Sequence, residues 1–244
     1  QHPKRQFSVK VGTIFEDSHI PLHKWFIAIY LITSHKKGIS SVQLGKDLGV
    51  TQKTAWFLNH RLREATKTKA FNVPLKNSVE VDETYIGGKE RNKHASKRSG
   101  ARGRSLKGGK ATAVALVERG GQLRAIQVPN TQKHVLHSVV ENNVALGSKI
   151  LTDEYAAYDG LETFYLRGSV NHVGGEYVVG DTHTNTAESF FALFKRGLIG
   201  IYHFTSKKHL QRYLNEFSFR YNLRDEENGM GFMSLLGNCG GRLT

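Results

Sequence analysis

Cysteine is almost absent from this sequence, which has a single one, Cys239, among 244 residues. One thiol cannot form an internal disulfide bond, nor can it supply the paired cysteines of a structural zinc site. The first ten residues are polar and basic, unlike a secretory signal peptide. These features exclude a disulfide-stapled secreted domain, and we expect a reducing, cytosol-like compartment.

Long hydrophobic runs are missing as well. The mean hydropathy is −0.42, and no stretch approaches the roughly 18 apolar residues that a membrane-spanning helix needs. Proline is scarce, with four residues, whereas 39% of all residues are hydrophobic and 10% are aromatic. The lack of apolar runs excludes a membrane-spanning protein. Because such a chain can bury one large core or two modest ones, its composition also disfavours intrinsic disorder.

Acidic residues are few relative to basic ones. The 35 Lys and Arg residues outnumber the 21 Asp and Glu residues, which gives a formal net charge of +14. An excess of this size predicts association with a polyanion, for which nucleic acid and an anionic membrane surface are the usual candidates.

Three helices are predicted in residues 13–70, with starts near Pro21, at Ser40 and at Thr51. Small Gly45 and the turn residue Gly49 give the second and third helices the spacing of a helix-turn-helix, whose second helix enters the major groove of DNA. We expect contacts with base edges or phosphates from Thr51, Gln52, Lys53, Asn59, Arg61 and Arg63. The alternative is a three-helix bundle that serves only packing.

The rest of the chain has the pattern of an α/β domain. Alternating apolar and polar residues from Val79 to Tyr85 predict a half-buried strand, followed by a hairpin, a helix, another strand, a further short helix, a last strand near Ser169 and two helices from Thr184 on. We therefore divide the chain into an N-terminal remnant (1–12), a helix-turn-helix domain (13–70), an α/β domain (78–225) with a basic arm (89–110), and a C-terminal tail (226–244).

Two aspartates lie on predicted strands. Asp82 is in the middle of Val79–Tyr85, and Asp153 closes the strand from Ile150. A carboxylate within an apolar strand requires a partner because its burial is costly. If the two strands pair, both carboxylates reach one point and suit a hard divalent cation such as Mg²⁺. Each aspartate could instead cap a turn or pair with a lysine.

The helix that follows Thr184 has a polar stripe along an otherwise apolar surface. Glu188 and Lys195 lie two turns apart with the small Ala192 between them, and Asn185 precedes Glu188 by one turn. Glu188 could complete a metal site, while Lys195 and the adjacent Arg196 could hold a DNA phosphate. The alternative is an ordinary solvated helix face.

The segment from Lys89 to Lys110 concentrates positive charge. Its glycines make it flexible, as expected of a segment that orders on DNA, although a loop that only aids solubility is the alternative. It holds nine of the 35 basic residues, namely Lys89, Arg91, Lys93, Lys97, Arg98, Arg102, Arg104, Lys107 and Lys110.

Three motifs together resemble a known family. They are Val81–Gly88, Thr152–Tyr158 and Asn185–Phe190, with 34 residues between Asp153 and Glu188 and with Lys195 seven residues after Glu188. This pattern resembles the DDE signature of insertion-sequence transposases, and most closely a bacterial group related to the eukaryotic Merlin elements. The resemblance implies an RNase H-like catalytic domain, a mixed five-stranded sheet with flanking helices, preceded by a small all-α helix-turn-helix domain.

The resemblance also implies a site and a function. Asp82, Asp153 and Glu188 would hold two Mg²⁺ or Mn²⁺ ions, with Asn185 and Lys195 as further catalytic residues. The implied partners are double-stranded DNA, as terminal inverted repeats and target, and further copies of the chain in a homodimer or larger synaptic assembly. The implied location is the nucleoid of a bacterial cytoplasm.

The sequence departs from this group at its beginning. Members usually carry a zinc ribbon before a stretch like Arg5–Val9, and no cysteine lies there. Either Asn185 or Glu188 can be the third metal ligand, and we favour Glu188 because a carboxylate binds a hard cation better than an amide does.

Two further functions remain open at this stage. A regulator or host-adopted transposase would bind DNA without catalysis, and a structure-selective nuclease would use the metals without sequence-reading helices. An intact set of Asp82, Asp153 and Glu188 favours an enzyme, because a binding module does not need all three.

Overall fold

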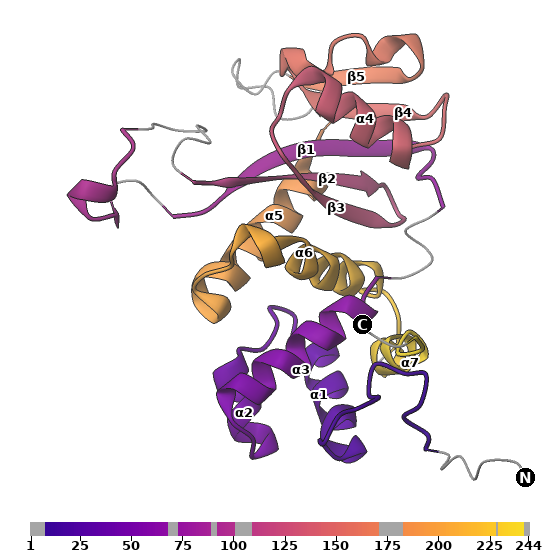
Figure 1. Ribbon diagram of the computed structural model, residues 1–244. Helices are drawn as coiled ribbons and strands as arrows, with labels where there is room; N and C mark the ends of the chain where they lie inside the picture. Colours follow the sequence, from indigo (N-terminus) through magenta and orange to yellow (C-terminus); the bar gives the residue numbers. More distant parts are fainter. Residues whose placement is uncertain are drawn as a thin grey trace, which may run out of the picture. The chain divides into compact units, whose positions relative to one another are not determined.

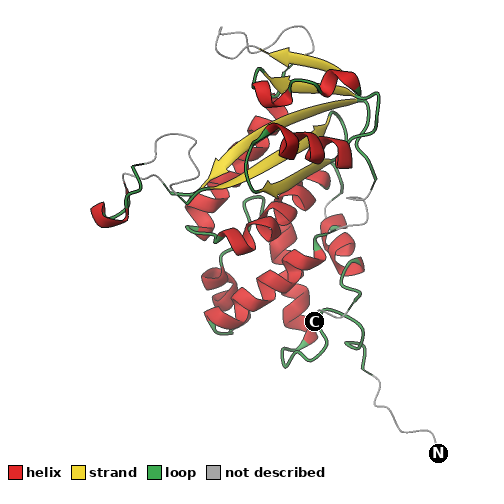
Figure 2. Cartoon of the chain, turned by 45° about the horizontal axis from the view of Figure 1, so that its top comes forward, coloured by secondary structure: helices red, strands yellow, loops and turns green. Residues whose placement is uncertain are grey.

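The computed structural model describes most of the chain, and its described residues form two compact units (Figure 1, Figure 2). One unit combines the chain up to residue 68 with the segment from residue 223 onward, and the other spans residues 69–222. The described ranges are 8–67, 73–88, 92–100, 109–170, 183–227 and 229–241.

The N-terminal unit contains the three predicted helices, α1 (Leu22–Ser34), α2 (Ser41–Leu48) and α3 (Gln52–Ala65). The expected caps are present. The Ser40 hydroxyl accepts a hydrogen bond from the amide of Gln43, and the Thr51 hydroxyl accepts one from the amide of Thr54. These bonds satisfy amides that have no partner within their helix, so the two helices begin where the sequence predicts.

The turn between α2 and α3 is tight. Gly49 has a φ of 59°, the left-handed conformation that glycine adopts without strain. A Cβ atom added at Gly45 would lie 3.0 Å from the carbonyl oxygen of Val50. The absence of a side chain at Gly45 thus allows the turn to pack directly on α2.

The sequence predicts a C-terminal tail over residues 226–244, but this segment is part of the N-terminal unit. It contains α7 (Met230–Gly237), which packs against α1, with the rings of Phe26 and Phe232 at 6.3 Å between centroids. The amide of Ile14 donates to the carbonyl of Cys239 at 2.9 Å. The segment therefore contributes to the core of the N-terminal unit. Within the expected remnant 1–12, residues 1–7 lie outside the described residues.

The second unit is built on one mixed sheet of five strands. Their order is β3-β2-β1-β4-β5, antiparallel across β3, β2 and β1 and parallel across β1, β4 and β5. The strands are β1 (Ser78–Ile86), β2 (Ala111–Glu118), β3 (Leu123–Val128), β4 (Lys149–Asp153) and β5 (Leu166–Val170).

Helices cover both faces of this sheet (Figure 1). On one face, α4 (Lys133–Asn143) packs against alternate apolar residues of the strands, including Val79 and Val81. On the other face lie α5 (Asn185–Gly197) and α6 (Lys207–Asn222). This arrangement confirms the expected α/β fold, a mixed five-stranded sheet with flanking helices. The alternation of a strand places Glu80 and Asp82 on the face that α5 covers.

Local differences from the prediction follow β4. The short helix expected after Asp153 consists of two 3₁₀ turns, Ala156–Tyr158 and Leu161–Thr163, and β5 begins at Leu166, slightly earlier than expected. A π-helical turn, Leu198–Tyr202, separates α5 from α6.

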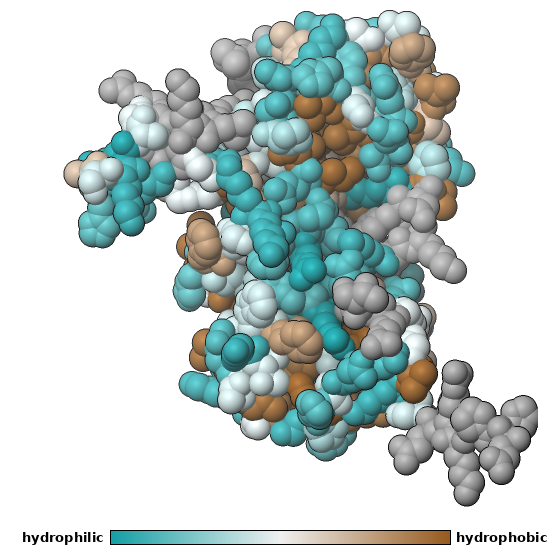
Figure 3. Space-filling view, in the orientation of Figure 1, coloured by the Kyte–Doolittle hydropathy of each residue, from teal (hydrophilic) through white to brown (hydrophobic). Residues whose placement is uncertain are grey.

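Hydrophilic side chains predominate on the face of the molecule shown in Figure 3, and hydrophobic ones form separate patches there. Within the described ranges, none of the helices combines the length and the apolarity that crossing a membrane requires.

Candidate active site

Asp82 lies near the middle of β1 and is half-buried. Its cross-strand neighbour on β2 is Ala115. Ala115 belongs to the hydrophobic cluster that α5 and α6 share with the sheet. The carboxylate therefore stands on a mostly apolar face, where ionisation is disfavoured unless a cation compensates the charge.

Asp153 ends the parallel neighbour strand β4. Glu80 of β1 pairs with Leu151 of β4, so extending this register by two residues brings Asp82 beside Asp153. The carboxylate of Asp153 accepts a hydrogen bond of 3.1 Å from the amide of Tyr155, which fixes the chain as it leaves the strand. The expected pairing of the two aspartate strands is thus confirmed.

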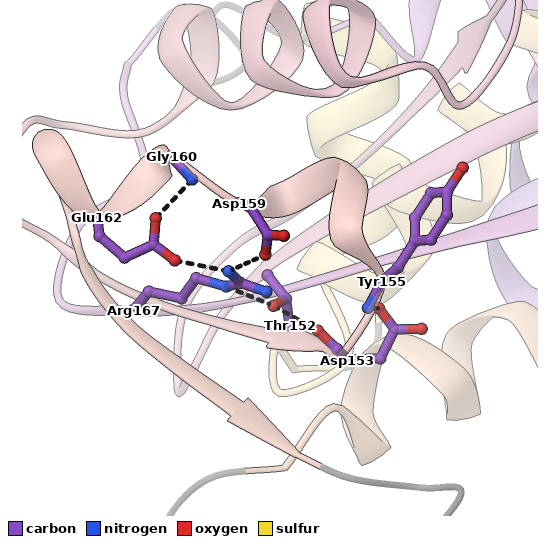
Figure 4. Close-up of polar contacts among 7 residues, drawn as sticks. All are labelled: Thr152, Asp153, Tyr155, Asp159, Gly160, Glu162 and Arg167. Atoms are coloured by element: carbon purple, nitrogen blue, oxygen red, sulfur yellow. Dashed lines mark hydrogen bonds and ion pairs between the residues drawn. The ribbon is translucent and has the colours of Figure 1, made fainter.

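Arg167 makes a group of polar contacts near the end of β4 (Figure 4). Arg167 of β5 donates to Thr152 at 3.2 Å, to Asp159 at 2.8 Å and to Glu162 at 2.6 Å. The bond from Arg167 lowers the pKa of Glu162 to about 2. In Figure 4 the Asp153 carboxylate lies on the side away from Arg167, so these ion pairs do not include it.

Glu188 comes from the first turn of α5 and is exposed. Asn185, at the start of the helix, is exposed too. The first turn places a carboxylate near the positive end of the helix dipole. Lys195 and Arg196 occupy the last turn and are also exposed, so the expected polar stripe along α5 is present.

The three expected carboxylates interact electrostatically. The pKa of Asp82 is raised from its usual 3.8 to about 7, mainly by burial and then by the charges of Glu83, Asp153 and Glu188, in that order. Like charges act in this way only at short range. The charges of Asp153, from a neighbouring strand, and of Glu188, from a helix, thus act on Asp82, while a metal site shared by the three carboxylates stays a prediction.

The carboxylates of this site have the chemistry of metal ligands, although they are not positioned to coordinate one ion together. Among the described residues, no three Asp, Glu, His or Cys side chains already form a metal-binding group. Three oxygen donors that repel one another nevertheless suit a hard divalent cation, which removes the repulsion.

Two other glutamates of β1 have roles that the sequence did not predict. Glu80 is fully buried on the same strand face as Asp82, and its carboxylate accepts hydrogen bonds from the start of α5. Glu83 accepts a bond of 2.8 Å from the hydroxyl of Tyr158, whose pKa is raised by burial and by Glu83. Glu80 also lies between two apolar strand residues, Val79 and Val81, so this pattern is the signal that could have identified it.

The first turn of α3 is exposed, as a DNA-reading surface requires. Thr51, Gln52 and Lys53 are all accessible, although the Thr51 hydroxyl is used as a helix cap and Gln52 donates to Ser41 at 2.8 Å. Trp56 continues this surface, with 39% of its area exposed.

Three other expected DNA contacts have structural roles instead. Asn59 and Arg63 are each 1% exposed, so their side chains lie inside the unit, and Asn59 donates to the carbonyl of Ile39. Arg61 donates to the carbonyls of Ile14 and Glu16. Burial prevents Asn59 and Arg63 from reaching DNA in this conformation, so the prediction for them is wrong.

Part of the basic arm is described. Lys97 and Arg98 are exposed beside a short 3₁₀ turn (Ala95–Lys97), Lys93 is half-buried, and the half-buried Lys110 immediately precedes β2. The other basic residues of the arm lie outside the described residues, namely Lys89, Arg91, Arg102, Arg104 and Lys107.

Comparisons with known proteins identify one family model, one similar protein sequence and one similar solved structure. The family model of the ISXO2-like transposase domain matches residues 74–222. A protein of the transposable element ISH50 of Halobacterium salinarum is 31% identical over 228 residues, which covers 88% of this chain and 75% of that protein. The structure of a pre-cleavage Mos1 transpososome is similar over 90% of this chain and 80% of that one, with 13% identity and a TM-score of 0.31. On the strength of the family model and the ISH50 relative, this chain belongs to the family of ISXO2-like transposase domains.

Proposed function

We propose that this protein is a DNA transposase that binds the terminal inverted repeats of a mobile element and catalyses metal-dependent strand cleavage and strand transfer. The observation that supports this most is the register of the sheet, which brings Asp82 of β1 beside Asp153 of β4. Membership of a transposase family supports the reaction class.

In this proposal Asp82, Asp153 and Glu188 hold the metal ions. Two bound Mg²⁺ or Mn²⁺ ions would supply an activated water or 3′-hydroxyl and stabilise the leaving oxygen of the phosphodiester. The pKa of Asp82 near 7 means that a proton leaves this carboxyl when a cation binds at neutral pH. Metal affinity should therefore increase with pH.

Lys195 and Arg196 would position the DNA. Both are exposed on the helix that carries Glu188, two turns further along. An ammonium and a guanidinium at this distance can bind phosphates on either side of the scissile bond. Asn185 would contact substrate or metal-bound water rather than act as the third ligand.

Sequence recognition would rest on α3. Its exposed first turn offers Gln52 and Lys53, and Trp56 lies one turn further on the accessible surface. We assign phosphate contacts to the arm, with Lys93, Lys97 and Arg98 as its described members. Joining two element ends requires two active sites, so we propose a homodimer or larger assembly at the bacterial nucleoid.

A catalytically inactive DNA-binding protein is the second candidate. It is favoured by one observation, namely that the carboxylates among the described residues do not already form a metal-binding group. Such a protein would bind DNA through the surface of α3 and would catalyse no metal-dependent reaction.

Strand transfer tests the proposal. The protein is incubated with a duplex that carries a pre-cleaved inverted-repeat end, a target plasmid and Mg²⁺ or Mn²⁺. We expect the labelled 3′ end to become covalently joined to the plasmid, and a chelator to abolish the product. Specific binding of the end without any joined product in either metal would favour the inactive DNA-binding protein.

A further inference from the structure

Glu80 is a fully buried carboxylate that lies two residues before Asp82 on the same face of β1. Burying a charge is costly unless it is paired and hydrogen-bonded. Arg119, which follows β2, donates to its Oε1 at 3.0 Å and supplies the opposite charge. The cost of burial is thus offset, and the remaining contacts of Glu80 show what this carboxylate holds.

Those contacts come from the beginning of α5 and from His183 just before it, whose Nδ1 lies 3.4 Å from Oε1 of Glu80. The amides of Thr186 and Ala187 donate to Oε2 of Glu80 at 2.8 and 3.2 Å, and the hydroxyl of Thr186 donates to Oε1 at 2.9 Å. The residue at the N-cap position, Thr184, makes no side-chain capping bond. A carboxylate 106 residues away from Thr186 along the chain therefore caps this helix.

The cap has a consequence for the candidate active site. Glu188 directly follows Ala187, so the backbone that carries Glu188 is hydrogen-bonded to the strand that carries Asp82. Any shift of α5 along the sheet would break charge-assisted bonds at Glu80. Glu80 thereby fixes the separation of two carboxylates that come from distant parts of the chain.

We propose that Glu80 is a positioning residue, which holds α5 against β1 so that Glu188 and Asp82 can bind the same divalent cations. Glu80 does not contact the reacting atoms, and its own oxygens are occupied by Arg119 and the start of α5. The metal-binding part of this inference rests on the proposed function, whereas the docking of α5 does not.

Hydrogen exchange tests the docking directly. Glu80→Ala removes the acceptor, and Glu80→Gln keeps one acceptor oxygen but directs an amide NH₂ at the donors. We expect amide exchange at Thr186 and Ala187 to accelerate at least about 10-fold in Glu80→Ala and less in Glu80→Gln. Glu141→Gln, which changes an exposed glutamate of α4, is the matched control and should leave both rates unchanged. Unchanged exchange in both Glu80 variants would overturn the inference.

A metal titration tests the positioning. The increase in melting temperature with added Mg²⁺ or Mn²⁺ gives a half-saturating concentration without any DNA chemistry. We expect it to rise roughly 10- to 100-fold in Glu80→Ala, as for other residues that orient metal ligands, with partial recovery in Glu80→Gln. Faster exchange with an unchanged half-saturating concentration would contradict the positioning role. If the unchanged protein shows no response to metal, the proposed function fails, while the exchange rates still decide whether Glu80 docks α5.

Discussion

Asp82 and Asp153 lie two residues beyond Glu80 and Leu151, which pair on two parallel strands of the sheet. The parallel register thus places the carboxylates of Asp82 and Asp153, which are far apart in the sequence, side by side on the sheet. Glu188 comes from a helix that covers the same face. Burial is the main reason why the pKa of Asp82 rises to about 7, and the charges of Glu83, Asp153 and Glu188 contribute to the rise.

Asp82 should make folding stability depend on pH. Its pKa is higher in the folded protein than the usual 3.8, so its stabilising contribution is complete below pH 4 and is lost as pH rises through 7. Without divalent metal, we expect the free energy of unfolding to fall by about 2–3 kcal/mol between pH 5 and pH 8, relative to the same change in Asp82→Asn. Urea unfolding at both values measures it. Identical pH profiles for the two proteins would contradict the raised pKa.

Asn185 and Glu188 can be distinguished as metal ligands. Glu188→Gln should abolish the increase in melting temperature with Mg²⁺, because it removes a charged oxygen donor, whereas Asn185→Ala should reduce metal affinity by less than about 10-fold. Both side chains are exposed, so neither change should impair folding. Loss of the metal response in Asn185→Ala alone would make Asn185 the ligand.

Lys53 and Arg61 of α3 should respond differently to substitution. Lys53→Ala should weaken binding to the inverted repeat at unchanged melting temperature, because Lys53 is exposed. Arg61→Ala should instead lower the melting temperature, because it removes donors to the carbonyls of Ile14 and Glu16. Fluorescence anisotropy and thermal unfolding of the two variants check this contrast, which would be refuted by a reversed pattern.

The described part of the arm should contribute to the salt dependence of DNA binding. Replacing Lys93, Lys97 and Arg98 with Gln should reduce the slope of log affinity against log salt concentration by about 0.9 for each lost phosphate contact. Affinity measured over a series of salt concentrations gives the slope. An unchanged slope would favour a loop that serves only solubility.

Gly45 should be required for the turn before α3. A Cβ atom there would lie 3.0 Å from the backbone oxygen of Val50, whereas one at Gly237 in α7 would have no heavy atom within 4 Å. Alanine favours helix at both positions, so the difference between the variants isolates the contact. We expect Gly45→Ala to be less stable than Gly237→Ala by about 1–2 kcal/mol in urea unfolding. Equal stability would show that the turn adapts.

Local patterns in the sequence predicted the elements well. The caps at Ser40 and Thr51, the alternation in β1 and the position of the hairpin depend on residues close together in the chain, and the structure contains all of them. The helical period also predicted the stripe of Glu188 and Lys195. The prediction that Asn59 and Arg63 contact DNA was wrong, because it followed from their polar side chains and not from their position around the helix. Both lie on the buried stripe with Ala55 and Leu62.

Contacts between distant residues could not be predicted in the same way. Glu80 caps a helix that begins more than a hundred residues later, and Glu83 pairs with Tyr158 at a separation of 75 residues. Neither pattern is visible without the sheet register and the packing of α5. The role of the C-terminal segment was missed for the same reason, because the contact of α7 with α1 joins opposite ends of the chain.

The central claim is that the carboxylates around Asp82 perform DNA strand transfer. The most direct test is the rate at which a pre-cleaved inverted-repeat end is joined to a target plasmid in Mg²⁺, measured for the unchanged protein, Asp82→Asn and Glu141→Gln. We predict a loss of at least about 1,000-fold in Asp82→Asn, with end binding retained, and no loss in Glu141→Gln. Joining by Asp82→Asn at the rate of the unchanged protein would contradict the account.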